Sequence, residues 1–303
     1  MKQYHDLLRH ILDNGEIRDD RTVVGTISVF GHNLRFDLSE GFPAITTKKL
    51  AWKAVAGELL WFIEGSGDER RLAEITHGTK EAAVTIWTPN ALAPYWKTKA
   101  EFEGDLGRVY GVQWRKWRTP VQHKQEVFTD EFGTRYNRHG STHFKETDQL
   151  KNLIKGLKND PFDRRHIITA WNPGELDKMA LPPCHMMAQF YVSKDNKLSC
   201  QMYQRSVDTF LGLPFNIASY ALFTHMIAQV CNLGVGELIM CLGDTHIYKD
   251  HVDQVKEQLS REEFDLPTLQ LNPLIDDIEK FTMNDIKLEG YQCHGSIKAT
   301  MAV

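Results

Sequence analysis

The sequence predicts an α+β fold in one domain that spans residues 1–303. Helical and strand-like segments follow one another irregularly, without the regular strand–helix–strand order that produces a doubly wound sheet. With 42% hydrophobic and 25% charged residues, the 303-residue chain can bury one large core. No repeat, low-complexity segment or linker divides it.

Charge and cysteine content narrow the class of protein. The formal net charge is -4 and no long block of lysine and arginine occurs, so we expect no extended nucleic-acid binding, but a mononucleotide still fits. The five cysteines are an odd number without a CxxC pair, which favours reduced thiols over a disulfide framework. The first residues lack the apolar core of a signal peptide, and no stretch of about eighteen apolar residues occurs. We therefore expect a cytoplasmic protein without membrane contact, located in the host cytoplasm if the chain is viral.

The N-terminal part contains helix and strand signals in turn. Residues 1–14 show an amphipathic pattern that stops at an Asn-Gly pair, which predicts a helix. Residues 24–38 alternate between apolar and polar types, which predicts strands or a hairpin broken near Gly31. Residues 46–65 predict a helix that begins with a threonine cap and ends at a glycine.

Glu58 lies on the stripe of the 46–65 helix that should face the core, in line with Leu50, Ala54 and Trp61. A buried glutamate that is satisfied by a hydrogen bond or an arginine is the commoner explanation of a single case. The alternative is an acid whose pKa is raised by an apolar pocket, so that it can pass protons.

The middle of the chain contains a long polar segment and, after a helix, a strand that begins next to two arginines. Residues 119–147 predict a surface insertion with loop-like character, and their histidines are spaced too irregularly for a metal site. Residues 148–158 predict an amphipathic helix. Residues 163–171 predict a strand entered through Arg164 and Arg165, adjacent arginines that are usually solvated but can form a fork for phosphate.

The densest signal lies in residues 181–216. Cys184 sits in a proline-braced turn, and a hairpin with strands at 187–192 and 198–205 follows it. A nearly continuous apolar segment at 215–233 then predicts a buried helix. Such a concentration of features indicates a site, although a single cysteine is more often an inert buried thiol.

The C-terminal part contains a short strand, a polar motif and a tail. A strand is predicted at 238–242 and a helix at 250–260, with His246 and Tyr248 two residues apart between them. The last three residues are apolar, which suggests that the tail docks onto the body of the protein.

Three further candidates have a structural explanation beside a functional one. Trp87 is either an aromatic side chain at the edge of the core or a stacking surface for a flat ligand. Asn216 either caps a helix or presents one donor and one acceptor to the edge of a base. Asp208, taken alone, can merely cap a loop.

Six sequence runs, spread in order over nearly the whole chain, carry a family resemblance. They are TTKKLAWKAVAGELLWFIEG, DLGRVYGVQWR, DRRHIITAWNP, MALPPCH, CQMYQRSVDTFLGLPFNIASYAL and GDTHIY. Together they resemble the folate-dependent thymidylate synthases that use a cysteine nucleophile. The resemblance implies a large mixed sheet flanked by helices, a homodimer paired through the sheet face, and no metal. It also implies conversion of dUMP to dTMP, with 5,10-methylenetetrahydrofolate as the donor of one carbon and a hydride.

The resemblance implies a role for each catalytic candidate. Cys184 resembles the nucleophile that adds to C6 of uracil, Glu58 the glutamate that organises proton transfer through water, and Tyr110 the tyrosine that assists proton removal at C5. Asn216, which would read the uracil edge, and Asp208 complete this set. Related enzymes that act on deoxycytidylate carry aspartate at the position of Asn216.

The remaining implied contacts are with the nucleotide and with folate. The implied nucleotide contacts are Arg21, Arg205 and Ser206 at the phosphate, Asn216 at the base, and His246 and Tyr248 at the sugar hydroxyl, with Arg164 and Arg165 donated by the partner subunit. The implied folate contacts are Lys48 at the glutamyl tail, then Trp87, Asn90, Asp208, Gly212 and Phe215, and the terminal Val303 as a lid. Each active site would therefore be shared by two subunits.

Three departures from the family pattern occur. Thr88 stands where the family has aspartate, Arg108 where it has proline, and residues 293–295 read CHG where it has PHP. The first and third lie near the implied folate pocket and lid. A dUMP 5-hydroxymethylase, in which water instead of hydride captures the methylene intermediate, is therefore an alternative. A non-catalytic nucleotide- or RNA-binding protein is a second one, and the presence of Cys184 and Glu58 counts against it.

Overall fold

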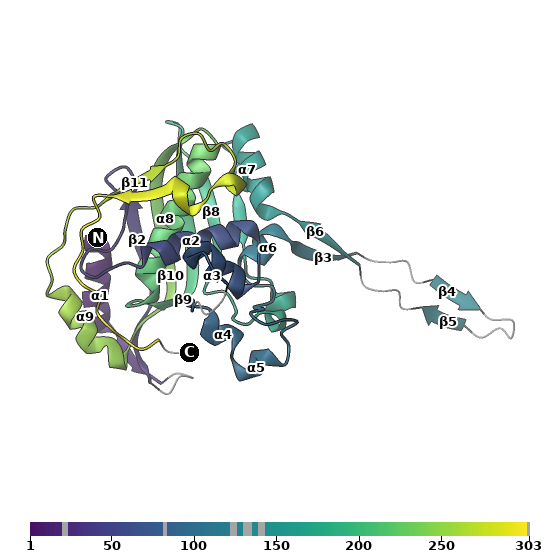
Figure 1. The fold of residues 1–303 in the computed structure, drawn as a ribbon, viewed down its shortest axis with the longest axis horizontal. Coiled ribbons are helices and arrows are strands. Elements are labelled where there is room, and N and C mark those ends of the chain that lie inside the picture. The colour runs from purple at the N-terminus through teal and green to yellow at the C-terminus, as the bar shows by residue number, and fades with distance from the viewer. Residues whose placement is uncertain (20–23, 81–83, 122–125, 130–134, 139–142, 302–303) are drawn as a thin grey trace.

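A mixed sheet forms the centre of the molecule (Figure 1). The computed structural model describes residues 1–19, 24–80, 84–121, 126–129, 135–138 and 143–301. In order across the sheet, the strands are β1 (Glu16–Arg18), β2 (Thr26–Asp37), β10 (Gly234–Tyr248), β9 (Lys197–Asp208), β8 (His185–Val192) and β7 (Ile167–Thr169). Strands β9 and β10 are parallel, and the other neighbouring pairs are antiparallel. The predicted α+β class with a mixed sheet is confirmed.

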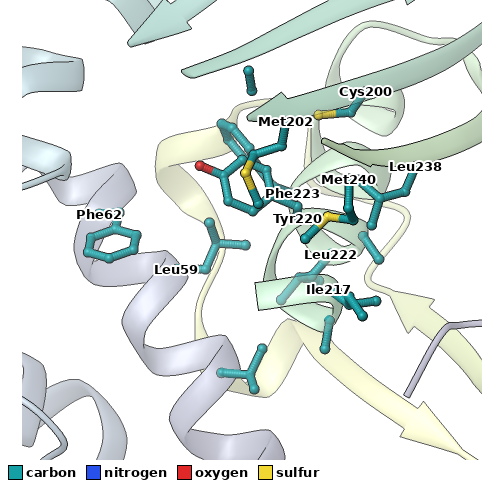
Figure 2. Packing of buried hydrophobic residues seen from close by; sticks show 14 of the residues in the cluster. Leu59, Phe62, Cys200, Met202, Ile217, Tyr220, Leu222, Phe223, Leu238 and Met240 are labelled. Carbon is teal, nitrogen blue, oxygen red and sulfur yellow. The ribbon is translucent and has the colours of Figure 1, made fainter. Parts of the chain in front are cut away.

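Two apolar helices supply much of the core. Helix α2 (Trp52–Glu64) packs against helix α8 (Gly212–Val230), and α8 packs on β9 and β10. Figure 2 shows the packed side chains, of which Leu59 and Phe62 come from α2, Ile217, Tyr220, Leu222 and Phe223 from α8, Cys200 and Met202 from β9, and Leu238 and Met240 from β10. Burial of this apolar surface stabilises the fold by roughly 25 cal/mol per Å². The predicted buried helix is confirmed.

The other elements surround this core. They are α1 (Lys2–Asn14), α3 (Glu69–His77), α4 (Thr88–Ala91), α5 (Pro94–Lys97), α6 (Gly111–Arg115), α7 (Gln149–Asn159), α9 (Val252–Leu259), the 3-10 helices η1 (Pro173–Lys178), η2 (Lys249–His251), η3 (Ile278–Lys280) and η4 (Met283–Asp285), and the strand pairs β3 (Trp117–Val121) with β6 (His143–Thr147), β4 (Glu126–Thr129) with β5 (Arg135–Arg138), and β11 (Thr268–Leu271) with β12 (Ile286–Glu289). Helices α1, α7 and α9 match the predicted segments closely. No helix in the described residues is both long and apolar enough to cross a membrane.

Two predicted strand breaks are wrong. Residues 26–37 form one strand that continues through Gly31, because this glycine adopts a φ of +81° and the neighbouring strand β10 pairs with both halves of β2. The predicted short strand at 238–242 is part of the longer β10. Gly243 allows this continuity, since a Cβ there would lie 2.8 Å from the carbonyl oxygen of Arg205 on β9.

Three other boundaries also differ from the prediction. Helix α2 has no threonine cap, because the hydroxyls of Thr46 and Thr47 bond to distant segments: Thr46 accepts from the backbone of Phe264 and Thr47 bonds to His5. The predicted strand at 163–171 shortens to β7. The polar insertion is not loop-like where it is described, since β3 pairs with β6 and β4 with β5 in an arm that extends away from the body (Figure 1).

Candidate active site

A cleft of about 500 Å³ brings several of the predicted residues together. It is lined by Cys184, Arg205, Ser206, His246 and Tyr248, among others. Because β9 and β10 are parallel, their C-terminal ends lie at the same edge of the sheet, and the last four of these residues come from those ends. The cleft therefore combines a thiol, a cation, hydroxyls and an imidazole.

The turn that carries Cys184 is braced by Arg205. The Arg205 side chain donates from Nε to the carbonyl of Pro183 at 2.9 Å and from Nη2 to the carbonyl of Pro182 at 3.0 Å. Its backbone N–H donates to the carbonyl of Cys184 at 2.9 Å. Cys184 is half-buried and forms no disulfide. The guanidinium adds positive charge to the cleft.

Tyr110 holds the backbone of Cys184 from the core side. The N–H of Cys184 donates to the Tyr110 hydroxyl at 2.8 Å, and the Tyr110 ring stacks on His185 with 4.2 Å between ring centroids. Burial, followed by the proximity of Cys184, raises the pKa of Tyr110 well above its ordinary value, so the hydroxyl keeps its proton. The residue has a φ of +27°, a strained conformation for a tyrosine that is typical of functional sites.

Glu58 is buried in the middle of α2 and accepts a hydrogen bond from Nε1 of Trp87 at 2.7 Å. Burial raises the pKa of Glu58 to about 7, although the Trp87 hydrogen bond acts in the opposite direction. Glu58 is therefore satisfied by a hydrogen bond, as the structural explanation requires, and its raised pKa is the property that the alternative, a proton-passing acid in an apolar pocket, would need. Trp87 is itself 6% exposed and lies at the edge of the core.

Asn216 is oriented by a residue that the sequence did not single out. Its Oδ1 accepts from Nε2 of Gln204 at 3.1 Å, and Gln204 is buried on β9 directly before Arg205. The Asn216 amide is therefore held from the sheet rather than used as a local helix cap. The position of Gln204 at the end of the hairpin, next to two other polar residues, is the signal that could have identified it.

His246 is buried and linked to two further side chains of the cleft. Its Nδ1 lies 3.1 Å from Oδ1 of Asp244, and Oδ2 of Asp244 accepts from Nη1 of Arg18 at 3.0 Å. The ring of Tyr248 packs edge-on against His246, with 5.1 Å between centroids. Arg18 and Asp244 also line the cleft. The sequence did not single out either residue.

A comparison with protein-family models identifies the family of the chain. The model of the thymidylate synthase family matches residues 2–303. The chain belongs to the thymidylate synthase family. The family methylates dUMP and uses methylenetetrahydrofolate as a co-substrate. In the described residues, no group of three or more histidine, cysteine, aspartate or glutamate side chains is placed to hold a metal ion.

Four of the residues expected at folate in this family, Lys48, Asp208, Gly212 and Phe215, lie around the start of α8. Oδ1 of Asp208 accepts from the backbone N–H groups of Phe210 and Leu211 at 3.1 and 3.0 Å, so Asp208 does cap this turn. The Lys48 amine donates to the carbonyl of Phe210 and lies 3.6 Å above the centre of its ring. Burial lowers the pKa of Lys48 to about 8, although the nearby Asp208 carboxylate acts in the opposite direction. Gly212 and Phe215 are half-buried in the first turns of α8.

Other expected site residues lie away from the described cleft. Arg164 and Arg165 are exposed just before β7, and Arg165 forms a forked pair with Asp163, at 2.9 Å from Nε to Oδ1 and 2.7 Å from Nη2 to Oδ2. Asn90 is half-buried in α4. The predicted site residues Arg21 and Val303 lie outside the described residues.

The residues at the positions that depart from the family pattern form specific hydrogen bonds. The Thr88 hydroxyl donates to Oε1 of the buried Glu69 at 2.5 Å. Arg108 is buried and donates from Nε to Oε2 of Glu175 at 2.5 Å. In the tail, the N–H of His294 donates to the carbonyl of Thr46 at 2.9 Å, just before α2. The Thr88 and Arg108 side chains thus take part in side-chain networks of the interior.

Proposed function

We propose that this protein is a thymidylate synthase that converts dUMP to dTMP, with Cys184 as the nucleophile. The thiolate sulfur forms a bond to C6 of uracil, and the π electrons of the C5–C6 bond move toward the C4 carbonyl, which makes C5 nucleophilic. One observation carries this proposal: Cys184 shares its cleft with Arg205 and Ser206, which suit a phosphate, and with His246 and Tyr248, which suit a sugar hydroxyl.

Glu58 and Tyr110 supply the proton transfers of this scheme. A glutamate whose pKa is about 7 can take up and release a proton at neutral pH without a large free-energy cost. The Tyr110 hydroxyl accepts a hydrogen bond from the Cys184 backbone and, because it keeps its own proton, can donate a hydrogen bond that assists proton removal at C5. Asn216, held by Gln204, presents its amide to the edge of the uracil ring.

The start of α8 and its surroundings fit the folate co-substrate. The residues that would hold it are Lys48, Trp87, Asn90, Asp208, Gly212, Phe215 and Val303. When bound, methylenetetrahydrofolate supplies the one-carbon unit and the hydride. An ammonium group such as that of Lys48 suits the carboxylates of a glutamyl tail, but Lys48 is packed on the Phe210 ring. Contact with the tail therefore requires the Lys48 side chain to leave that ring.

The proposed homodimer pairs two copies through the outer sheet face. On the antiparallel strands β8 and β9, Met187 and Tyr203 are cross-strand partners with exposed side chains, and Tyr191 is 66% exposed on β8. Exposed apolar side chains gathered on one sheet suit a protein interface. Arg164 and Arg165 are exposed and lie outside the cleft of their own chain, which suits a contact with the phosphate site of a partner, and Arg165 would exchange its pair with Asp163 for that contact.

A complementation experiment tests this shared site. Cys184→Ala and Arg164→Ala variants are each expected to be nearly inactive, but their mixture should regain activity, since a mixed dimer contains one site with both residues intact. Sedimentation equilibrium gives the oligomeric state of each variant. Absence of recovery in a mixture that forms dimers would contradict the donation of Arg164 across the interface.

The product distinguishes the proposed enzyme from its alternatives. The mass of the nucleotide formed from dUMP and methylenetetrahydrofolate is expected to be that of dTMP, with one dihydrofolate per turnover. A hydroxymethyl product without dihydrofolate would support the hydroxymethylase. The observation in favour of this alternative is that Thr88 and residues 293–295 depart from the family pattern near the implied folate site. No product from the wild type, with nucleotide still bound, would support a binding protein. Cys184→Ser should abolish turnover while nucleotide binding persists.

The base specificity is tested at Asn216. In Asn216→Asp the side chain can present a carboxylate or a carboxylic acid in place of the amide, which alters the pattern of donors and acceptors offered to the base. We expect kcat/KM for dUMP to fall and that for deoxycytidylate to rise, measured with both nucleotides in parallel. An equal loss on both nucleotides would contradict a role in reading the base.

A further inference from the structure

Three polar side chains form a continuous chain at one wall of the cleft. Arg18 of β1 donates from Nη1 to Oδ2 of Asp244 at 3.0 Å, and Oδ1 of Asp244 lies 3.1 Å from Nδ1 of His246. All three residues line the cleft that contains Cys184. Arg18 lies 226 residues before Asp244 in the sequence, so the fold is needed to join them.

This chain determines which nitrogen of His246 carries a proton. A carboxylate has no proton to donate, so the hydrogen bond between Asp244 and His246 is donated by Nδ1. In a neutral imidazole the other nitrogen, Nε2, is then a hydrogen-bond acceptor. Because Arg18 holds the second carboxylate oxygen, the Asp244 side chain is kept in the orientation that faces the imidazole.

We propose that Arg18 and Asp244 are positioning residues that orient His246 to accept a hydrogen bond from the 3′-hydroxyl of the nucleotide. The inference rests on the proposed function, in which dUMP is the substrate. In dUMP the 3′-hydroxyl is the one free sugar hydroxyl, because C2′ carries hydrogen and the 5′ oxygen carries phosphate. A nucleotide without this hydroxyl would leave Nε2 of the buried His246 unpaired, and an unpaired buried acceptor costs binding free energy.

A second ion pair on the same strand provides a matched control. Glu237 is on β10, like Asp244, and pairs with Nη1 of Arg35 at 2.5 Å. Its side chain is 39% exposed and that of Asp244 is 38% exposed, so both pairs have similar access to solvent. Neither Glu237 nor Arg35 lines the cleft. A general effect of losing a β10 ion pair can therefore be separated from an effect on His246.

The test compares dUMP with 2′,3′-dideoxyuridylate, which lacks the 3′-hydroxyl. For the wild type, kcat/KM and the calorimetric Kd are both expected to favour dUMP by about tenfold or more, the value of one good hydrogen bond. Asp244→Ala should lose most of this preference, because it weakens dUMP but leaves the dideoxy nucleotide nearly unchanged. Arg18→Ala should lose part of it, and Asp244→Asn, whose amide oxygen can still accept from Nδ1, should retain part of it. Glu237→Gln should keep the wild-type preference.

The outcomes separate this inference from the proposed function. If Asp244→Ala weakens the binding of both nucleotides by the same factor, Asp244 has only a structural role and the inference is wrong. If the wild type forms no dTMP, the proposed function fails, while the ratio of the two Kd values still tests the orientation of His246.

Discussion

The buried Glu58 predicts an opposition between stability and activity that depends on pH. Its carboxyl is 5% exposed, and burial raises its pKa from 4.5 to about 7. The folded protein therefore holds this proton more tightly than the unfolded chain does, and the free energy of unfolding falls as pH rises between these two values. This difference in pKa lowers the free energy of unfolding by ~3 kcal/mol once the carboxyl is ionised in both the folded and the unfolded state.

Glu58→Gln removes this cost because the amide cannot ionise. Its carbonyl oxygen can still accept from Nε1 of Trp87, so the core contact persists. The variant and the wild type should have similar free energies of unfolding at pH 4.5, and above pH 7 the variant should be more stable by ~3 kcal/mol. Its rate of dTMP formation should fall by about 100-fold, the usual contribution of a general acid or base.

The assay is urea unfolding of both proteins from pH 4.5 to 8.5 at one protein concentration, since the stability of an oligomer depends on concentration. Glu175→Gln is the control of opposite sign. Burial raises the pKa of Glu175, but hydrogen bonds from Arg108 and Gln113 and the charge of Arg108 outweigh it, so the pKa is lower than usual. This variant should be less stable than the wild type at neutral pH, and the deficit should remain nearly constant down to about pH 4.5, the ordinary pKa of a glutamate, and shrink only below it. A difference for Glu58→Gln that does not change with pH would refute the reasoning.

Three further predictions concern single side chains. Arg108→Ala leaves the buried Glu175 without its cation and should lower the free energy of unfolding by about 3–5 kcal/mol. Arg118→Ala, which removes a more exposed ion pair, should lower it by about 1 kcal/mol or less. Both values are measured by urea unfolding. Comparable losses in the two variants would contradict the burial argument. Tyr110→Phe should slow dTMP formation by about tenfold or more with an unchanged Kd for dUMP, and an unchanged rate would exclude a catalytic hydroxyl. Because burial lowers the pKa of Lys48 to about 8, the unfolding free energy of the wild type should rise from pH 8 to 10 relative to that of Lys48→Met.

Local patterns predicted the elements whose structure depends on neighbours in the sequence. Helices α1 and α7 follow from apolar residues repeated at helical spacing, and the β8–β9 hairpin follows from alternation around a short polar turn. The predictions failed where tertiary pairing prevails over local preference. Gly31 by itself predicts a break, but β10 pairs on both sides of it, and the hydroxyl of Thr47 is bonded to His5 instead of capping α2.

Some contacts of the candidate site also follow from the local sequence, whereas others depend on the tertiary structure. Cys184 and Arg205 are close in the chain because one hairpin carries both, so the sequence could connect them. The sequence places Gln204 next to Arg205, but the contact of Gln204 with Asn216 depends on how α8 packs on the sheet. The pairing of Arg18 with Asp244 has no signal in the sequence, since each residue is an ordinary charged side chain until β1, β2 and β10 are aligned.

The sequence by itself determined the class of fold, the family and the chemical groups available to the site, because these depend on residue types and their local spacing. The tertiary structure alone decided what those groups can do. The proton affinity of Glu58 depends on its burial and on an indole 29 residues away, and the acceptor nitrogen of His246 depends on a carboxylate held by a distant arginine. Desolvation and hydrogen bonding act over a few ångströms in space, and only the folded chain specifies which atoms lie within that distance.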